Sequence, residues 1–222
     1  MHLRELFSTL PSNIIRCFSP FNLVLQLAAV ILTWLIVASG LDWAYFEYFN
    51  HTVLYVPLFS AGVIGFFLPL ILPVALVIYG IRKKQKRSVV LGYAIAQAQL
   101  IALLITSFYK VFTGRSHPPI FPSGVVADTS RIFQFGFFHG GAFWGWPSSH
   151  CAVAFAMATL VFLVYRRKPV WGYAAIIYAL FIAFGVSATA HWFSDAVAGS
   201  IIGVIAGAAV ARSVKMSIKV LM

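Results

Sequence analysis

Three short segments of this chain combine imidazole, cationic and hydroxyl side chains. Their side chains are Lys110, Arg115 and His117 in the first, Ser148, Ser149 and His150 in the second, and His191 and Asp195 in the third. Such groups together can hold phosphoryl oxygens and move a phosphoryl group. Each segment borders a long apolar run, where an ionisable group costs about 2.5–3.5 kcal/mol at a bilayer centre and so indicates function.

The spacing of His191 and Asp195 predicts a nucleophile with its orienting partner. The two residues lie four positions apart, one helical turn, so the carboxylate can accept the imidazole N–H. The other ring nitrogen is then available to attack phosphorus. A structural His-Asp pair at a helix start would have the same spacing.

Pro147-Ser148-Ser149-His150 begins the next apolar run. Proline and serine start helices well, and a helix N-terminus attracts phosphate through its unpaired N–H groups and partial positive charge. An ordinary helix start with a histidine facing lipid headgroups would look alike. Lys110 alone also fits a lysine that reaches the membrane interface. The convergence of three such segments favours a single oxyanion site.

The composition predicts that these segments belong to a polytopic membrane protein. Hydrophobic residues make up 61% of the chain and charged residues 9%, whereas a soluble domain is roughly 25% charged. A span needs about 20 apolar residues. Six runs fit, at Phe21–Leu41, Phe59–Ile81, Val89–Tyr109, His150–Tyr165, Val170–Ala190 and Asp195–Ala211.

The distribution of positive charge predicts the orientation. Counting six spans puts one large set of basic residues on a single face: Arg4, Arg16, Arg82, Lys83, Lys84, Lys86, Arg87, Arg166, Arg167, Lys168, Arg212, Lys215 and Lys219. By the positive-inside rule this face is cytoplasmic and holds both termini. The three polar segments then face the periplasm or exterior of the cytoplasmic (inner) membrane. Because the basic residues are split among short loops, topogenesis explains the net charge of +11 better than nucleic-acid binding does.

One long outer connection, about residues 110–149, alternates glycine with aromatic residues. The aromatic residues are Phe133, Phe135, Phe137, Phe138, Phe143, Trp144 and Trp146. Such density is typical of the water–lipid boundary. We expect the loop to lie on the membrane and to shape the entrance for an amphiphile, and an interfacial anchor without a substrate role is the alternative.

In order and spacing, the three segments resemble the motifs of the type 2 phosphatidic acid phosphatase (PAP2) superfamily, membrane lipid phosphatases related to haloperoxidases. The family's motifs are Lys, six residues, Arg-Pro; then Pro-Ser-Gly-His; then Ser-Arg, five residues, His, three residues, Asp. Here His117 replaces the first arginine, Ser149 replaces glycine, and Phe184-Gly185 replaces Ser-Arg. Arg115, Arg131 or His139 are candidates to supply the missing charge.

The resemblance covers the last four of the six runs, and with the run count it leads us to expect an all-α bundle of six transmembrane helices in one domain, residues 1–222, with its motif-bearing core at about 89–212. It implies hydrolysis of a lipid phosphate or pyrophosphate without a cofactor or metal, and the charge count puts this reaction at the extracytoplasmic face. His191 would form a phosphohistidine, Asp195 would orient it, and His150 would protonate the leaving group. Lys110, Arg115, His117, Ser148 and Ser149 would bind the phosphoryl oxygens. The alternatives are a lipid phosphotransferase and a non-catalytic lipid-binding or lipid-translocating relative.

Overall fold

The structure, a computed structural model, describes residues 3–121, 126–142, 145–165 and 169–220. Phe143, Trp144 and the basic residues 166–168 lie outside these ranges, as do the side chains of residues 3–7 and 215–220. The described chain folds into eight helices: α1 (Leu3–Cys17), α2 (Pro20–Ala38), α3 (Leu41–Asn50), α4 (Tyr55–Arg82), α5 (Lys86–Thr113), α6 (Ser149–Val164), α7 (Pro169–Thr189) and α8 (Phe193–Val220). The expected all-α class is confirmed.

Five of these helices are long and apolar enough to cross a membrane. They are α2, α4, α5, α7 and residues Phe193–Val214 of α8. The fourth expected span corresponds to α6, which is apolar but has only 16 residues. At 1.5 Å per residue it is about 24 Å long, shorter than a hydrocarbon core of about 30 Å. The chain is therefore a multi-pass membrane protein with five candidate spans.

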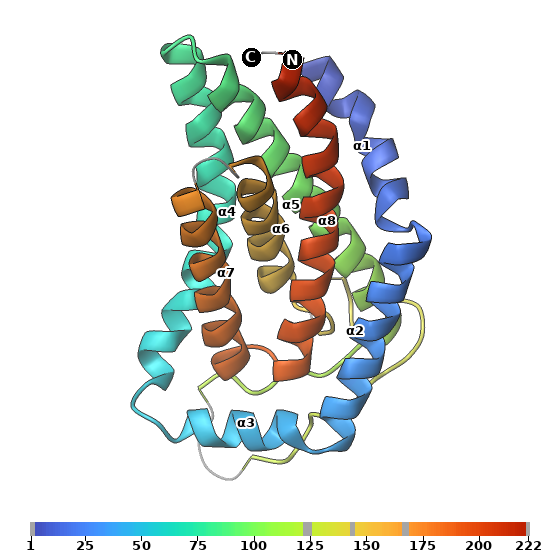
Figure 1. Cartoon of the computed structure of the whole chain (residues 1–222). Coiled ribbons are helices and arrows are strands. Elements are labelled where there is room, and N and C mark those ends of the chain that lie inside the picture. The colour runs from blue at the N-terminus through green and yellow to red at the C-terminus, as the bar shows by residue number, and fades with distance from the viewer. Residues whose placement is uncertain (1–2, 122–125, 143–144, 166–168, 221–222) are drawn as a thin grey trace.

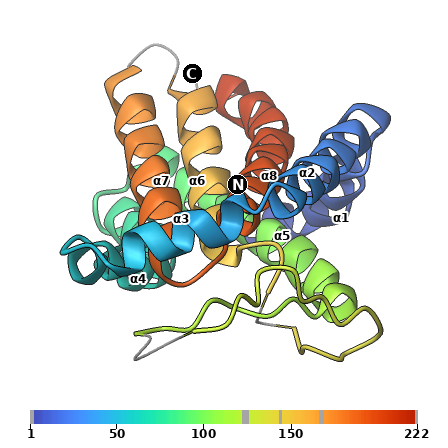
Figure 2. The ribbon, with the colours of Figure 1, turned by 90° about the horizontal axis from the view of Figure 1, so that it is seen from below.

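Two helices, α1 and α3, were not predicted, because both are shorter than a membrane span. Helix α1 is held to the bundle by polar contacts: Asn13 donates to Gln97, and Arg16 donates to the carbonyl of Ala209. Helix α3 crosses the end of the bundle opposite the two termini, beneath the ends of the long helices (Figures 1 and 2). It contributes aromatic and acidic side chains to that end.

Helix α8 packs against α6 along three glycines spaced one turn apart. A Cβ added at Gly199, Gly203 or Gly207 would collide with the carbonyl oxygens of Ser148, Ala152 and Ala156 in turn. Small residues at this spacing let two membrane helices approach backbone to backbone. The close approach fixes the start of α6 against the first turns of α8.

The long connection between α5 and α6 lies at the same end of the bundle as α3 (Figure 1). It turns back over the end of α5, since the N–H groups of Gly136 and Phe138 donate to the carbonyls of Phe112 and Val111. Gly114 ends α5 in the left-handed region, at φ +47°, which glycine adopts without strain. The three polar segments of the sequence therefore meet at one end of the molecule.

Candidate active site

The histidines of all three segments gather at this end. His150 lies in the first turn of α6, His191 lies in the connection from α7 to α8, and His117 follows the end of α5. The ring of His191 lies 4.7 Å from that of His117 and 5.8 Å from that of His150, measured between centroids. The expected convergence of the three segments is thus observed.

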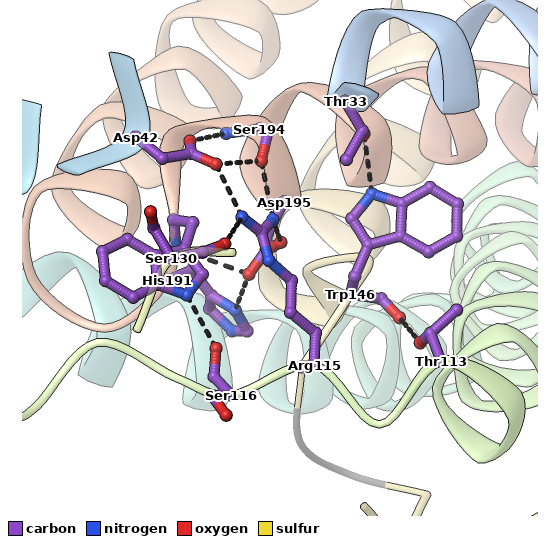
Figure 3. Close-up of polar contacts among 12 residues, drawn as sticks. Thr33, Asp42, Thr113, Arg115, Ser116, Ser130, Trp146, His191, Ser194 and Asp195 are labelled. Atoms are coloured by element: carbon purple, nitrogen blue, oxygen red, sulfur yellow. Dashed lines mark hydrogen bonds and ion pairs between the residues drawn. The ribbon is translucent and has the colours of Figure 1, made fainter. Parts of the chain in front are cut away.

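His191 faces the carboxylate of Asp195 in the first turn of α8. Its Nδ1 lies 3.5 Å from Asp195 Oδ2, longer than an ordinary hydrogen bond (Figure 3). The connection is anchored on either side, because the N–H of His191 donates to Val186 and the indole of Trp192 donates to Ser116. These contacts leave Nε2 as the ring nitrogen that faces away from the carboxylate.

Burial keeps the His191 imidazole neutral. Desolvation lowers the pKa of His191 from 6.5 to about 3, although the neighbouring Asp195 carboxylate opposes the shift. Only the neutral imidazole has a lone pair with which to attack an electrophile. At neutral pH the side chain is therefore in its nucleophilic form.

Lys110 is fully buried in the last turn of α5, with its Nζ donating to the carbonyl of Gly145 at 2.6 Å. An ammonium has three donors, so this bond orients the group with donors remaining for a ligand. Gly145 precedes the segment that leads into α6. Lys110 thus links the end of α5 to the start of α6.

The start of α6 is held directly against α8. Ser148 caps the helix, its side chain accepting from the N–H of Cys151, and its own N–H donates to the carbonyl of Asp195 at 3.0 Å. Ser149 Oγ lies 3.0 Å from the hydroxyl of Thr106. The Nδ1 of His150 is buried and has no hydrogen bond within the described residues. The N–H groups of this first turn have no carbonyl of the helix to bond.

His117 is engaged with the backbone through both ring nitrogens. Its Nδ1 lies 2.9 Å from the carbonyl oxygen of Ala190, and its Nε2 accepts the N–H of Gly145. An imidazole that donates from one nitrogen and accepts at the other is the neutral tautomer. Burial, the largest influence, lowers the pKa of His117 in the same direction. The residue that stands where the family has arginine is therefore uncharged in this structure.

Arg115 is buried, and its guanidinium donates to four protein groups. The acceptors are Asp195 Oδ1, Ser194 Oγ, Asp42 Oδ2 and the carbonyl of Ser130. The rings of Phe133 and Trp192 flank the guanidinium at 4.8 and 5.9 Å. Nη1 and Nη2 of the cation expected to bind phosphate are thus directed to protein groups, two of them carboxylates, while its buried Nε has no hydrogen-bond partner among the described residues.

The other two candidate cations, Arg131 and His139, lie elsewhere, in the long connection between α5 and α6. Arg131 is exposed, and its guanidinium lies beside Gly40, in the turn between α2 and α3. A Cβ added to Gly40 would lie 3.6 Å from Arg131 Nη2. His139 is exposed, with its ring against Gly136. In the part of the chain that the structure describes, no three His, Cys, Asp or Glu side chains form a metal-binding group.

Sequence reasoning missed Asp42, Ser130 and Ser194 as parts of this site. Asp42 had one usable signal, a carboxylate between two apolar runs, which the cost of burying a charge makes unusual. Ser194 directly precedes Asp195, and Ser130 contributes only a carbonyl. Neither serine has a signal in residue type or spacing.

Residues 87–219 match the family model of the PAP2 superfamily, more than half of the chain. The chain therefore belongs to this superfamily, whose members are typically phosphatases. The match confirms the resemblance inferred from the three motifs. Neither the curated proteins nor the solved structures include a match. Helices α1 to α4, with Asp42, precede the matched region.

Proposed function

We propose that this protein hydrolyses a lipid phosphate or pyrophosphate at the extracytoplasmic face of the membrane through a phosphohistidine intermediate. The observation that carries the proposal is the convergence of His191, with the Asp195 carboxylate behind it, and His150 and His117 at one end of a bundle of apolar helices. Membership of the PAP2 superfamily supports the reaction class.

In the proposed reaction, Nε2 of His191 attacks phosphorus while the bond from phosphorus to the leaving oxygen breaks. Asp195 stabilises the positive charge that develops on the imidazole. The protonated form of His150 donates a proton to the leaving oxygen, and the neutral imidazole that remains then accepts one from the water that attacks the phosphohistidine. Phosphate leaves and His191 returns to its neutral form.

The phosphoryl oxygens would bind between Lys110 and the start of α6. Lys110 supplies the positive charge, and Ser149 with the N–H groups of the first turn of α6 supplies donors. Ser148 sets the position of that turn through its contact with Asp195. In this proposal Arg115 and His117 have supporting roles. Arg115 Nη1 and Nη2 and His117 Nδ1 are directed to protein groups, while the buried Nε of Arg115 has no hydrogen-bond partner within the described residues.

The proposal includes six membrane spans in one domain over residues 1–222. The short helix α6 is the span added to the five long helices. Both termini and the basic residues of the α4–α5 turn lie at the end opposite the histidines (Figure 1). The positive-inside rule then puts the histidines outside the cytoplasm. The acyl or prenyl chain of the substrate would enter sideways from the outer leaflet.

The experiment is phosphate release by the purified protein in detergent from a panel of lipid phosphates and pyrophosphates. We expect release that withstands EDTA, is inhibited by vanadate, and is abolished by His191→Ala. His139→Ala, an exposed histidine of the same outer end, is the matched control and should retain activity. Full activity of His191→Ala would exclude the phosphohistidine. Labelled phosphate in an added acceptor lipid would identify a transferase, and binding without turnover a non-catalytic relative.

A further inference from the structure

Asp42 is a fully buried carboxylate at the start of α3, in the part of the chain before the family match. Both of its oxygens are engaged. Oδ1 accepts from the N–H of Ser194 at 2.8 Å, and Oδ2 accepts from the hydroxyl of Ser194 and from Arg115 Nη2, each at 2.6 Å. Asp42 therefore caps the first turn of α8 from another helix and pairs with Arg115.

Arg115 connects Asp42 to the carboxylate behind the proposed nucleophile. Its Nη2 donates to Asp42 and its Nη1 donates to Asp195 Oδ1, and all three side chains are fully buried (Figure 3). Asp195 Oδ2 in turn faces His191. A guanidinium is planar with donors in fixed directions, so the position of one carboxylate constrains that of the other. The four side chains therefore form a continuous series of contacts, from Asp42 through Arg115 and Asp195 to His191.

Aromatic packing adds a second link between α3 and the nucleophile. The ring of Phe46 meets that of Trp192 edge to face at 5.6 Å, and Trp43 lies 6.5 Å from the same indole. Trp192 is fully buried and directly follows His191. Helix α3 thus contacts the connection that carries His191 through both charge and packing.

We propose that Asp42 is a positioning residue for phosphoryl transfer, holding Arg115 and the first turn of α8 so that Asp195 orients His191 for attack. The inference rests on the proposed function. Asp42 acts through Arg115 and Ser194, and it touches neither His191 nor the phosphoryl group.

Two physical effects make the position of Asp42 consequential. Without this carboxylate, Arg115 keeps a buried charge with Asp195 as its remaining carboxylate partner, and Asp195 is drawn toward the guanidinium. The 3.5 Å contact of Asp195 with His191 would lengthen further, and a misplacement of about 1 Å can reduce a rate about 10²-fold. The N–H of Ser194 would also lose its acceptor at the start of α8.

Helix α3 offers a matched control for this effect. Glu47 lies five residues after Asp42 on the same helix, and its side chain is exposed. Asp42→Asn and Glu47→Gln each replace a carboxylate with an amide of the same shape. The comparison separates the loss of a charge on α3 from the loss of the contacts of Asp42.

The test is the steady-state kinetics of both variants on a lipid phosphate that the wild type hydrolyses. We expect Asp42→Asn to lower kcat about 10- to 100-fold with KM nearly unchanged, because the nucleophile is misplaced while the phosphate site is intact. Glu47→Gln should match the wild type. A wild-type kcat for Asp42→Asn, or an equal loss in both variants, would overturn the proposal.

A double-mutant cycle with Arg115→Met tests whether Asp42 acts through Arg115. Once Arg115 is gone, Asp42→Asn should lower kcat much less than it does in the wild type, since coupled residues have non-additive effects. Losses that multiply independently would overturn this route. If Asp42→Asn does not fold in detergent, Ser194→Ala replaces it, and an unchanged kcat in that variant would overturn the proposal.

NMR of ¹³C-histidine-labelled protein in micelles gives a readout that does not need turnover. The resonances of His191, assigned from their loss in His191→Gln, should shift in Asp42→Asn and stay in place in Glu47→Gln. Unshifted His191 resonances in folded Asp42→Asn would reject the positioning role. Failure of the wild type to release phosphate from any lipid would instead reject the proposed function.

Discussion

His191 combines two properties at the scale of single residues: its neutral form is stabilised by burial, and its orientation is set by a carboxylate that other residues hold. The first follows from desolvation, which takes the pKa of His191 to about 3. The second depends on Arg115, whose carboxylate partners are separated from it by 73 and 80 positions in the chain. A buried neutral imidazole of this kind needs no deprotonation before it acts as the proposed nucleophile.

The lowered pKa of His191 predicts that the protein loses stability in acid. The unfolded chain binds a proton at the ordinary value of 6.5, whereas the folded protein does so only at about 3. The contribution of the neutral imidazole to stability is therefore complete above pH 6.5 and is lost as the pH falls between these two values. The lowered pKa of His117 acts in the same direction.

Thermal melting in detergent between neutral and acid pH measures this effect. We expect the Tm of the wild type to fall with pH and that of His191→Gln to fall less steeply. His139→Gln, in which an exposed histidine changes, should follow the wild type. Parallel melting curves for the wild type and His191→Gln would show that His191 does not take up the proton on unfolding.

His150→Ala should lose activity in a way that depends on the leaving group. General-acid assistance is typically worth about 10²–10⁴-fold, and it matters most when the leaving oxygen is basic. Hydrolysis of a lipid phosphate, whose leaving group is a basic alkoxide, should therefore show a loss of this size. Hydrolysis of p-nitrophenyl phosphate, which has an acidic leaving group, should be slowed much less. The measurement is kcat/KM on both substrates. An equal loss on both would assign His150 to phosphate binding instead.

The His191–Asp195 pair could be predicted because its residues lie four positions apart, and the His150 segment because Pro147 and Ser148 have the residue types of a helix start. The partners of Arg115 could not be, since Asp42 lies on another helix and no spacing rule joins them. The sequence led us to expect that His117 binds the phosphoryl oxygens, and this stays a prediction. The backbone contacts that favour its neutral form come from Gly145 and Ala190, which residue type alone does not reveal.

At the scale of helices, the apolar runs predicted α2, α4, α5, α7 and α8 well because a span has a length set by the bilayer. Helices α1 and α3 follow no such rule. Helix α3 has only 10 residues, and its packing on Trp192 involves partners nearly 150 residues away. Short helices fixed by tertiary contacts are not determined by local sequence.

The close packing of α6 on α8 predicts opposite outcomes for two helical glycines. A Cβ at Gly203 would collide with the carbonyl of Ala152 and lie 2.7 Å from Cβ of Phe155, whereas a Cβ at Gly62 meets nothing within 4 Å. Gly203→Ala should lower the free energy of unfolding by about 1–3 kcal/mol through overpacking. Gly62→Ala should raise it by up to about 1 kcal/mol, the difference in helix propensity.

Unfolding of both glycine variants by a denaturing detergent, followed by circular dichroism, measures these changes. Phosphate release at low temperature gives a second readout, since a shift of α8 moves Asp195 relative to Ser148. Equal stability of the two variants would mean that α6 and α8 are not packed backbone to backbone.

At the scale of the whole molecule, the two ends of the bundle differ in charge and in chemistry. One end carries the α4–α5 turn with its five basic residues, Arg82, Lys83, Lys84, Lys86 and Arg87. The other carries the histidines, α3 and a loop with exposed Phe135, Phe137 and Phe138. This asymmetry suits a protein that takes an amphiphile from one leaflet and reacts with its headgroup in the adjacent water.

Two glutamines at opposite ends of the bundle test this orientation. Gln134 in the long loop and Gln85 at the start of α5 are both exposed, while the native Cys17 and Cys151 are fully buried. With the histidines outside, Gln134→Cys should react with a membrane-impermeant thiol reagent in intact cells, and Gln85→Cys only after permeabilisation. The wild type, with its two buried thiols, is the control for background labelling. The reverse labelling pattern would put the proposed active site on the cytoplasmic side. It would also mean that the positive-inside rule does not hold for this chain.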